Sequence, residues 1–453
     1  MRLQFTNIGM IEKADVKIKK LTILVGENDS GKSTLGKLLY SLVNGMINLD
    51  STFNGYKNEI IIKNLEEIQK RVNNSEKWQV EKESGKHKEN FNDEFDFFFM
   101  EPELIEIKNL KKIISNDNFE KVKLGIEELI ISLRKYIELE EVKIFFERIE
   151  EALKYTKEND FIRKLNLNKA LNLEFKGQIN NLFIKENGAK IKIQYQDTDV
   201  FSIDIKDNKV DTIKEYKTLY TSDVAYIETP FIFNSINDYL MYPWMQFGNK
   251  RSNLKDHNKK LIEMILDSSK RKEFNPLDEA LFDKKLNDFQ KTINNQLSGE
   301  VKFSAERKDF VLIRGEKEIL LSNTAMGIKS MALLSILLKN KFFDKDNILV
   351  IDEPEVHLHP KWQIEYARIV VAIAKEFDTK IIITSHSPYF IEAIQKFSEQ
   401  FEIRDETNFY MLKKESETSL TSSVKDVNDN LEEVYKRLGE AYQNLDELTL
   451  GDL

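Results

Sequence analysis

A run of residues near the start of the chain has the composition of a loop that binds phosphate: Gly26, Glu27, Asn28, Asp29, Ser30, Gly31, Lys32, Ser33 and Thr34. The run fits the pattern G-x-x-x-x-G-K-[ST]. Gly26 and Gly31 allow backbone conformations and a close approach that a Cβ would prevent. Lys32 supplies a cation for the β- and γ-phosphates, and the Ser33 hydroxyl is a ligand for Mg²⁺. These residue types predict a binding site for ATP and Mg²⁺.

The residues on either side of this run predict a strand before it and a helix after it. Residues 21–25 form a short apolar run that is typical of a buried strand. The helix is indicated by leucines at helical spacing and is expected to stop at Gly45: Leu35, Leu38, Leu39 and Leu42. A helix N-terminus after a glycine loop aims N–H groups at an anion. The alternative is an ordinary strand–turn–helix in which Gly-Lys-Ser occurs by chance.

A second motif lies far along the chain and adds two carboxylates. Residues 348–351 have no polar side chain, as expected of a strand that is buried on both faces. Asp352 at the end of this strand can hold Mg²⁺, directly or through water. Glu353 can take a proton from an attacking water, and a positioned general base is worth about 10²–10⁴ in rate. The alternative is that both carboxylates only cap the turn at Pro354.

His386 follows a further predicted core strand, residues 380–384. The segment between the two strands has the apolar stripe of a helix, so the three elements predict a crossover in a parallel sheet. His386 and Asp352 then share one edge of the sheet, which is where ligands of such sheets bind. There the imidazole can donate to the γ-phosphate and hold the attacking water. A purely structural histidine is the alternative.

Composition limits the class of protein. An apolar content of 41% over 453 residues suits a sizeable core in two or three lobes. The absence of cysteine excludes disulfides and thiolate metal sites and fits a reducing compartment. No apolar run approaches the roughly 18 residues of a membrane span, and the first residues predict a strand rather than a signal peptide. We therefore expect a cytoplasmic protein with no membrane contact.

A net charge of −9 argues against a generally basic nucleic-acid coat. Residues 250–272 are nevertheless rich in lysine and arginine. A DNA contact is one interpretation of this segment. A solvated helix face is the other.

The pattern along the chain predicts an α/β fold with a parallel core sheet, an antiparallel β subdomain and helical inserts. Residues 1–50 begin the ATPase lobe, and residues 51–170 form a helical insert. Residues 171–249 are β-rich and rejoin the core. Residues 250–298 are helical, and residues 299–453 complete the lobe.

Three segments carry finer expectations. Alternating apolar residues from Leu171 to Tyr216 predict antiparallel strands, and residues 301–321 predict a two-stranded hairpin that turns near Gly315. The last helix has one apolar face, which either packs on its own lobe or docks an effector chain: Leu431, Val434, Leu438, Ala441, Tyr442, Leu445 and Leu448.

The order of the motifs resembles one family. After the phosphate loop come two runs, Asp352-Glu353-Pro354-Glu355-Val356-His357-Leu358-His359-Pro360 and Thr384-Ser385-His386-Ser387-Pro388. This order resembles the ABC-type ATPase heads of the OLD (overcoming lysogenization defect) class and its standalone AAA-family relatives, which are related to SMC and DNA-repair heads. The resemblance implies a P-loop NTPase that hydrolyses ATP and dimerises head-to-head around it. It also implies a bacterial anti-phage role, as sensor or scaffold for a separately encoded effector.

The same resemblance identifies residues 323–330 as a signature loop, which in such heads reaches the ATP of the other subunit. Ala325 stands where a serine is usual, so one side-chain contact with the γ-phosphate is lost. The Gly327 N–H and the following helix N-terminus can still bind phosphate. A loop without any contact across a dimer is one alternative, and an ATP switch that does not hydrolyse is another.

Two further features of the family have weak matches. His357 and His359 alternate, but no third ligand stands at zinc-like spacing, and the resemblance puts them in a loop at the dimer interface. The glutamine loop of such heads has two candidates, Gln246 and the segment around Glu228.

Full-length OLD proteins carry a C-terminal Toprim nuclease domain. The segment after His386 is shorter than the roughly 100 residues that such a module needs, so we expect no nuclease in this chain. A DNA-repair or recombination head is a competing function. A transporter subunit is another, although its Leu-Ser-Gly-Gly-Gln loop does not occur here.

Overall fold

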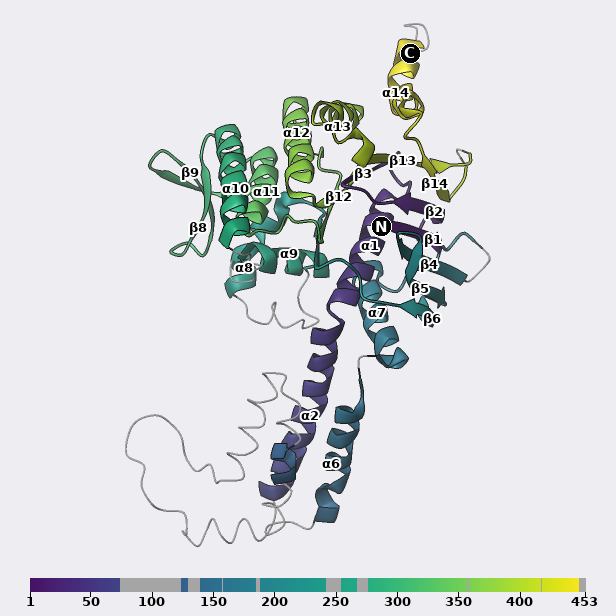
Figure 1. The fold of residues 1–453 in the computed structure, drawn as a ribbon, viewed down its shortest axis with the longest axis vertical. Helices are drawn as coiled ribbons and strands as arrows, with labels where there is room; N and C mark the ends of the chain where they lie inside the picture. Colours follow the sequence, from purple (N-terminus) through teal and green to yellow (C-terminus); the bar gives the residue numbers. More distant parts are fainter. Residues whose placement is uncertain are drawn as a thin grey trace, which may run out of the picture. The chain divides into compact units, whose positions relative to one another are not determined.

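The computed structural model describes most of the chain (Figure 1). The described residues are 1–73, 124–128, 139–156, 158–184, 188–241, 254–266, 276–356, 358–416 and 418–447. They form two compact units, one made of Met1–Ile47 with Leu167–Leu453 and the other of Asn48–Asn166. The five functional segments expected from the sequence remain predictions. The candidate site lies in the first unit, which is described first.

One large sheet organises the first unit, with strand order β6-β5-β4-β1-β2-β14-β13-β3-β12-β11-β7 among the described residues. Its antiparallel half contains β1 (Arg2–Ile8), β2 (Ile11–Lys17), β4 (Gly188–Tyr195), β5 (Thr198–Lys206) and β6 (Lys209–Tyr216). Its parallel half contains β13 (Thr407–Lys414), β3 (Leu21–Val25), β12 (Lys380–Ser385), β11 (Asn347–Asp352) and β7 (Asp223–Ile227). The strand β14 (Ser422–Asp426) joins the halves. The predicted α/β fold with a parallel core is confirmed.

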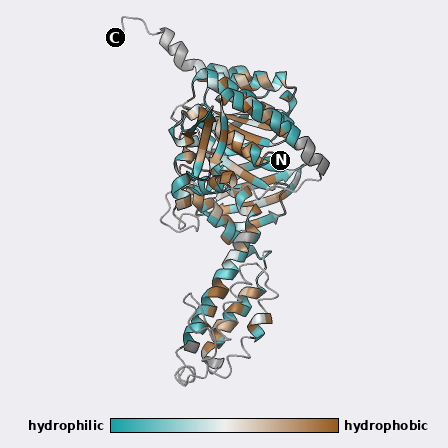
Figure 2. Cartoon of the chain, turned by 90° about the vertical axis from the view of Figure 1, so that its left-hand side faces the viewer, coloured by the Kyte–Doolittle hydropathy of each residue, from teal (hydrophilic) through white to brown (hydrophobic). Residues whose placement is uncertain are grey.

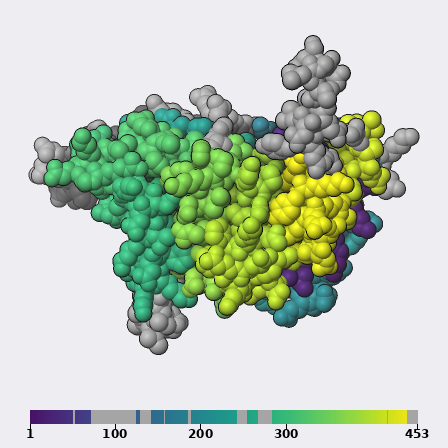
Figure 3. Space-filling view, turned by 90° about the horizontal axis from the view of Figure 1, so that it is seen from above, coloured from purple at the N-terminus to yellow at the C-terminus, as the bar shows by residue number. Residues whose placement is uncertain are grey.

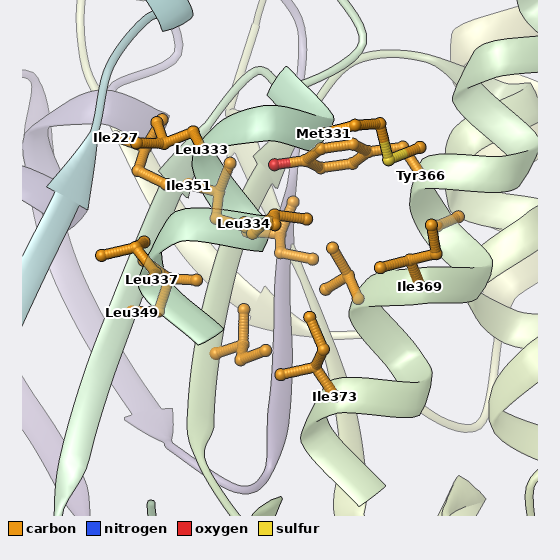
Figure 4. Close-up of a cluster of buried hydrophobic side chains, with 14 of the residues drawn as sticks. Ile227, Met331, Leu333, Leu334, Leu337, Leu349, Ile351, Tyr366, Ile369 and Ile373 are labelled. Atoms are coloured by element: carbon orange, nitrogen blue, oxygen red, sulfur yellow. The ribbon is translucent and has the colours of Figure 1, made fainter. Parts of the chain in front are cut away.

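Helices cover both faces of the parallel half. On one face lie α1 (Lys32–Ile47) and the end of α7 (Asp160–Phe175), packed on alternate residues of the strands. On the other lie α11 (Met326–Lys339), α12 (Pro360–Phe377) and α13 (Pro388–Gln400). Figure 4 shows α11 between the strands and α12, with Met331 and Leu334 in the cluster beside Tyr366 and Ile369. The predicted crossover from β11 through α12 to β12 is present.

Burial on both faces explains why these strands are almost wholly apolar. Every residue of β3 and of β11 is buried, as is all of β12 after Lys380. Figure 2 shows apolar residues concentrated in the strands and hydrophilic residues on the outer helices. A parallel strand between two helix layers has no solvent face that would require polar side chains. Polar residues with a candidate role are therefore expected chiefly at the carboxyl ends, where Asp352 and Ser385 lie.

The structure differs from the sequence-based expectations at three places. The helix α1 does not stop at Gly45 but continues to Ile47, and Gly45 lies where a Cβ would come within 3.0 Å of Ala170. Residues from Leu171 to Phe175 end the helix α7 instead of forming a strand, because their apolar face packs on α1 and the sheet. The expected hairpin has a third strand: β8 (Glu300–Ser304), β9 (Asp309–Arg314) and β10 (Lys317–Leu320).

Between β7 and β8 along the chain, the described residues form further helices. They are η1 (Pro230–Asn234), α8 (Ile236–Met241), α9 (Asp256–Leu266) and α10 (Pro276–Leu297). Two lysines of the basic segment form ion pairs within the chain. Lys255 pairs with Glu228, and Lys260 Nζ lies 2.6 Å from Asp223 Oδ1. Lys250, Arg251 and the lysines and arginine at 270–272 lie outside the described residues.

The C-terminal helix α14 (Leu431–Glu447) packs on its own lobe over its first turns. Leu431 and Val434 are buried in the core cluster, and the Tyr435 hydroxyl donates to Gln395 Oε1 of α13 at 2.8 Å. Figure 3 shows the green helices and the yellow C-terminal segment as one continuous surface. The first half of the apolar face therefore packs on its own lobe. Leu448 lies outside the described residues.

The second unit is helical where it is described. The helices α2 (Leu49–Asn73) and α6 (Leu139–Lys154) pack against each other. Their buried side chains include Ile61, Leu65, Ile68, Val142, Phe146 and Ile149. Within the described parts of the chain, no helix is both long and apolar enough to span a membrane.

The contact between α1 and the sheet generates the first prediction. A Cβ at Gly36 would lie 3.0 Å from Tyr226 and 3.1 Å from Val350, so Gly36→Val should overpack this contact and cost about 1–3 kcal/mol of unfolding free energy. Gly55→Val is the matched control, because Gly55 is an exposed helical glycine with nothing within 4 Å of its Cβ. Thermal unfolding should show a lowered Tm for Gly36→Val only. An equal shift in both variants would contradict the close approach.

Candidate active site

The phosphate loop connects β3 to α1 through two residues with left-handed backbone. Asp29 has φ 59° and Gly31 has φ 92°. A Cβ at Gly31 would also come within 2.9 Å of Ile11 Cγ1, so only glycine suits that position. The loop is anchored from the far end of the chain, since Ser422 Oγ donates to Ser30 O at 2.6 Å. The first N–H groups of α1 therefore face a loop of fixed shape.

The other loop residues lie around this cradle. Thr34 is in the first turn of α1, where its N–H donates to Gly31 O at 3.0 Å, and Asn28 is exposed. Two acidic residues of the loop are bridged to the C-terminal segment. Glu27 Oε1 accepts from Arg437 Nε of α14 at 2.7 Å, and Asp29 lies 3.7 Å from Lys414 Nζ of β13.

Lys32 is buried inside the loop. Its Nζ donates to Gly26 O at 2.8 Å and to Glu27 O at 2.7 Å, and it lies 3.4 Å from Glu353 Oε1. The sequence predicts a mobile cation, whereas only 4% of Lys32 is exposed and its charge is already solvated by carbonyls. To reach a phosphate, the ammonium must exchange these carbonyls for phosphate oxygens.

Asp352 is the point at which four segments meet. Its Oδ1 accepts from Ser33 Oγ at 3.1 Å and from Thr384 Oγ1 at 2.5 Å, and its Oδ2 accepts from Tyr226 OH at 2.9 Å. The donors come from α1, β12 and β7, and Asp352 ends β11. The predicted pair of Ser33 and Asp352 is thus brought together. Both groups present oxygen, which is the ligand atom that Mg²⁺ prefers.

Glu353 follows with left-handed backbone, at φ 46°. This conformation costs about 1–3 kcal/mol for a residue other than glycine, and it is held by two bonds from Glu353 N, to Thr384 O at 3.1 Å and to Thr384 Oγ1 at 3.0 Å. The turn directs the carboxylate toward Lys32 and His386. The neighbouring His386 and Lys32 lower the pKa of Glu353. Partial burial of the carboxylate opposes this shift but does not outweigh it.

His386 stands between two carboxylates. Its Nδ1 lies 3.4 Å from Glu353 Oε1 and 3.4 Å from Glu355 Oε1, without hydrogen-bond alignment to either. The Glu353 carboxylate raises the pKa of His386, and burial only partly opposes it. The structure thus brings Lys32, Asp352, Glu353 and His386 together at one edge of the sheet. Their spacing in the sequence predicts this arrangement.

Glu355 is a residue of this edge to which the sequence pattern assigns no role. It is 4% exposed, and its Oε1 accepts from Ser385 Oγ at 2.7 Å and from the backbone N–H of His386 at 2.8 Å. Burial raises the pKa of Glu355, and these hydrogen bonds oppose the shift. The carboxylate therefore fixes the loop that carries His386. Its only signal in the sequence is its place in the Glu353-Pro354-Glu355 run.

Tyr226 was also missed, because nothing in the apolar strand β7 marks its hydroxyl as a partner of Asp352. Burial and the Asp352 carboxylate raise the pKa of Tyr226. Glu228, one of the two glutamine-loop candidates, borders a cavity of about 260 Å³ together with Asp352 and Glu353. The other candidate, Gln246, lies outside the described residues.

The signature loop leads into the N-terminus of α11. Ala325 is the N-cap and supplies no side-chain cap, so the first N–H groups of α11 keep their capacity to bind an anion. Gly327 packs on the Trp362 ring, where a Cβ would lie 3.1 Å from the ring atoms. Close packing on α12 thus accounts for this glycine, and binding of phosphate by its N–H stays a prediction.

Of the two alternating histidines, His359 is among the described residues. His359 is the N-cap of α12, and its Nδ1 accepts from Lys361 N at 3.3 Å. This bond gives His359 a structural role. His357 lies outside the described residues.

The site fits a magnesium nucleotide. Ser30 Oγ in the loop and His386 Nδ1 after the neighbouring strand β12 are buried polar atoms that have no hydrogen-bond partner among the described residues. A buried polar atom normally has a partner, and a phosphate oxygen is an acceptor for both groups. The loop N–H groups, the Ser33 hydroxyl and the Asp352 carboxylate complete a set of donors for phosphate and ligands for Mg²⁺.

Solved structures of several ATPase heads align along nearly the whole chain. The SMC head domain from Thermotoga maritima is 10% identical and aligns over 94% of this chain and 98% of its own, with a TM-score of 0.37. The Smc head domain with an extended coiled coil from Pyrococcus furiosus, bound to the C-terminal domain of ScpA, is 10% identical over 97% and 98%, with a TM-score of 0.38. An ATP-binding cassette of an ABC transporter is 11% identical over 97% and 95%, with a TM-score of 0.30.

The sequence itself matches a family model. The model is that of the AAA ATPase domain, and the match extends over residues 1–391. This range includes the phosphate loop, the acidic strand end and His386, which are the parts of the site described above. The chain therefore belongs to the AAA ATPase domain family.

Proposed function

We propose that this ATPase hydrolyses ATP with Mg²⁺ at the carboxyl edge of β3, β11 and β12. The observation that supports this best is the network in which Lys32, Glu353 and His386 meet within 3.4 Å. These residues come from three different strand ends. A cation, a carboxylate of lowered pKa and an imidazole at a phosphate loop are the groups that phosphoryl transfer to water needs.

Each side chain then has a defined task. The loop N–H groups and Lys32 bind the phosphates, while Ser33 and Asp352 hold Mg²⁺, which neutralises phosphate charge when bound. Glu353, ionised because of its lowered pKa, accepts the proton of the attacking water. His386 holds that water or the γ-phosphate through a ring N–H. Glu355 acts on the reaction only by fixing the backbone of His386.

We propose further that two copies of the chain form a head-to-head dimer around ATP. The signature helix α11 packs on η1 next to β7. The strands β12 and β11 lie between β7 and β3 in the sheet. At the usual strand spacing, the distance from β7 to β3 is about 14 Å. Within one chain, the N-terminus of α11 and the phosphate loop therefore belong to different parts of the edge. A two-fold axis would bring the Gly327 region of one copy to the nucleotide of the other.

We assign the chain to OLD-class heads on the basis of the motif order, and propose that it is a sensor or scaffold of an anti-phage system. The reaction that harms the phage would then belong to a separate effector protein. A DNA-repair head is the competing function. The two differ in whether DNA alone stimulates ATP hydrolysis.

Two substitutions should separate binding from turnover. Lys32→Ala should weaken Mg²⁺–ATP binding about 10–100-fold, because a charge-assisted contact is worth about 1.5–3 kcal/mol. Glu353→Gln keeps the shape of the side chain and should preserve binding while phosphate release falls about 10²-fold or more. Calorimetry and a phosphate-release assay measure the two effects. The exposed Lys396→Ala is the control.

Either of two results would contradict these assignments. Equal ATP affinity for the wild type and Lys32→Ala would remove the phosphate-loop role. Phosphate release by Glu353→Gln within a few-fold of the wild type would show that another group activates the water.

The dimer should accumulate when ATP is bound and cannot be hydrolysed. We expect Glu353→Gln with Mg²⁺–ATP to elute as a dimer in size-exclusion chromatography with light scattering, and Lys32→Ala to stay monomeric under the same conditions. The difference follows from a composite site that needs bound nucleotide to close. If Glu353→Gln with saturating ATP is monomeric at micromolar concentration, the head-to-head proposal fails.

The purified chain alone should leave plasmid DNA and tRNA intact in the presence of ATP with Mg²⁺ or Mn²⁺. A metal nuclease needs converging carboxylates of its own, and the strand-end carboxylates described here are assigned to ATP. A gel assay with wild type and Glu353→Gln provides the comparison. Cleavage that both proteins show after repeated purification would overturn the scaffold proposal.

A further inference from the structure

A buried ionic network lies behind the candidate site. His257 of α9 has no exposed side-chain surface, and both of its ring nitrogens face carboxylates. Nδ1 lies 2.8 Å from Glu174 Oε2 of α7, and Nε2 lies 3.3 Å from Glu228 Oε2 after β7. His257 N also donates to Glu174 Oε1 at 3.3 Å. The imidazole therefore joins α7, α9 and the end of β7.

The charges of this network balance. With a carboxylate at each ring nitrogen, the imidazolium form of His257 can donate on both sides. Burial lowers the pKa of His257, but the bonds to Glu174 and Glu228 outweigh burial, and the net shift is upward. Lys255 also donates to both oxygens of Glu228, and the hydrogen bond from His257, together with Lys255, lowers the pKa of Glu228 to about 2. Pairing of this kind offsets part of the desolvation cost of the buried charges.

Tyr226 links this network to the proposed Mg²⁺ ligand. The ring of His257 packs edge-on against Tyr226, with centroids 4.8 Å apart. The Tyr226 hydroxyl donates to Asp352 Oδ2 at 2.9 Å. Glu228 follows the end of β7, two residues after Tyr226. His257 contacts both of them.

Tyr40 of α1 closes this arrangement. Its ring lies 6.0 Å from His257 and 6.1 Å from Tyr226, between centroids. Because α1 begins at the phosphate loop, the rings of Tyr40, Tyr226 and His257 connect α1 and α9, through β7, to the strand end that bears Asp352. Glu228 meanwhile forms part of the wall of the cavity next to Glu353.

We propose that His257 is a positioning residue for ATP hydrolysis, which orients Asp352 through Tyr226 and holds Glu228 at the cavity beside Glu353. The inference rests on the proposed ATPase site. His257 itself does not touch the nucleotide. Its removal frees the ring of Tyr226 to turn and leaves Glu174 as a buried carboxylate without its partner, so the Asp352 carboxylate loses one fixed donor.

The test compares His257→Gln and Tyr226→Phe with the wild type, using full-length protein and steady-state phosphate release. Outer partners of a metal ligand are worth about 10–100-fold in activity or metal affinity. We expect each variant to lower kcat about tenfold and to raise the Mg²⁺ concentration for half-maximal rate, with the KM for ATP little changed. The double variant should be no worse than His257→Gln, since that variant already disturbs the bond that Tyr226→Phe removes. Lys259→Gln, on the same helix outside the network, should match the wild type.

The outcomes are distinguishable from failure of the ATPase proposal itself. If the wild type does not hydrolyse ATP, both proposals fall. If the wild type hydrolyses ATP but Tyr226→Phe retains its kcat and Mg²⁺ dependence, the positioning role is overturned and the ATPase stands. Tyr226→Phe removes one hydroxyl only and keeps the packing, so this result decides even where His257→Gln unfolds. Losses that add in the double variant would also contradict a shared route through Asp352.

Discussion

The carboxylate of Asp352 is the constraint on which the rest of the site depends. A buried carboxylate without partners is expensive, and here hydroxyls from α1, β12 and β7 donate to it. Each donor reaches Asp352 only if its strand or helix is correctly positioned along β11. A shift of one residue in β12 would replace Thr384 with a side chain on the opposite face. The polar requirement of one residue therefore fixes the relative positions of four elements that are otherwise held by non-directional apolar packing.

The phosphate loop depends in a similar way on segments that are remote in the chain. Ser422, Lys414 and Arg437 all contact it, although they follow the loop by most of the length of the protein. The backbone at Asp29 and Gly31 is left-handed and needs such support. Contacts of this separation form late in folding, because a long loop must close first. The nucleotide site should thus be complete only when β13 and β14 have joined the sheet and α14 has packed on the lobe.

The features that could be predicted are those marked by residues close together in the sequence. The buried strands and the residues at their ends are marked by local patterns, and parallel pairing then forces Asp352 and His386 to one edge. The end of α1 was misjudged at Gly45, since glycine there serves the approach of α7 and not a stop. Leu171 to Phe175 lie in a helix, because a run of so few residues fits both the helical and the strand pattern of apolar residues. Packing in the folded chain then selects the helix. Tyr226, Glu174 and His257 come from three segments with no shared motif, so only the folded chain reveals them.

The distribution of charge at the edge explains how an anion can bind among so many carboxylates. Asp352, Glu353 and Glu355 would repel a phosphate if they faced it alone. The phosphate loop instead presents N–H groups and Lys32 from the side of β3, whereas the carboxylates lie on β11 and the turn after it. The two sets meet only at Ser33 and Lys32, each of which contacts a carboxylate. A divalent cation between phosphate and Asp352 would relieve the remaining repulsion. In the proposed function, this arrangement would favour the magnesium complex of the nucleotide over the free anion, and Glu353 would be the carboxylate available to a water molecule.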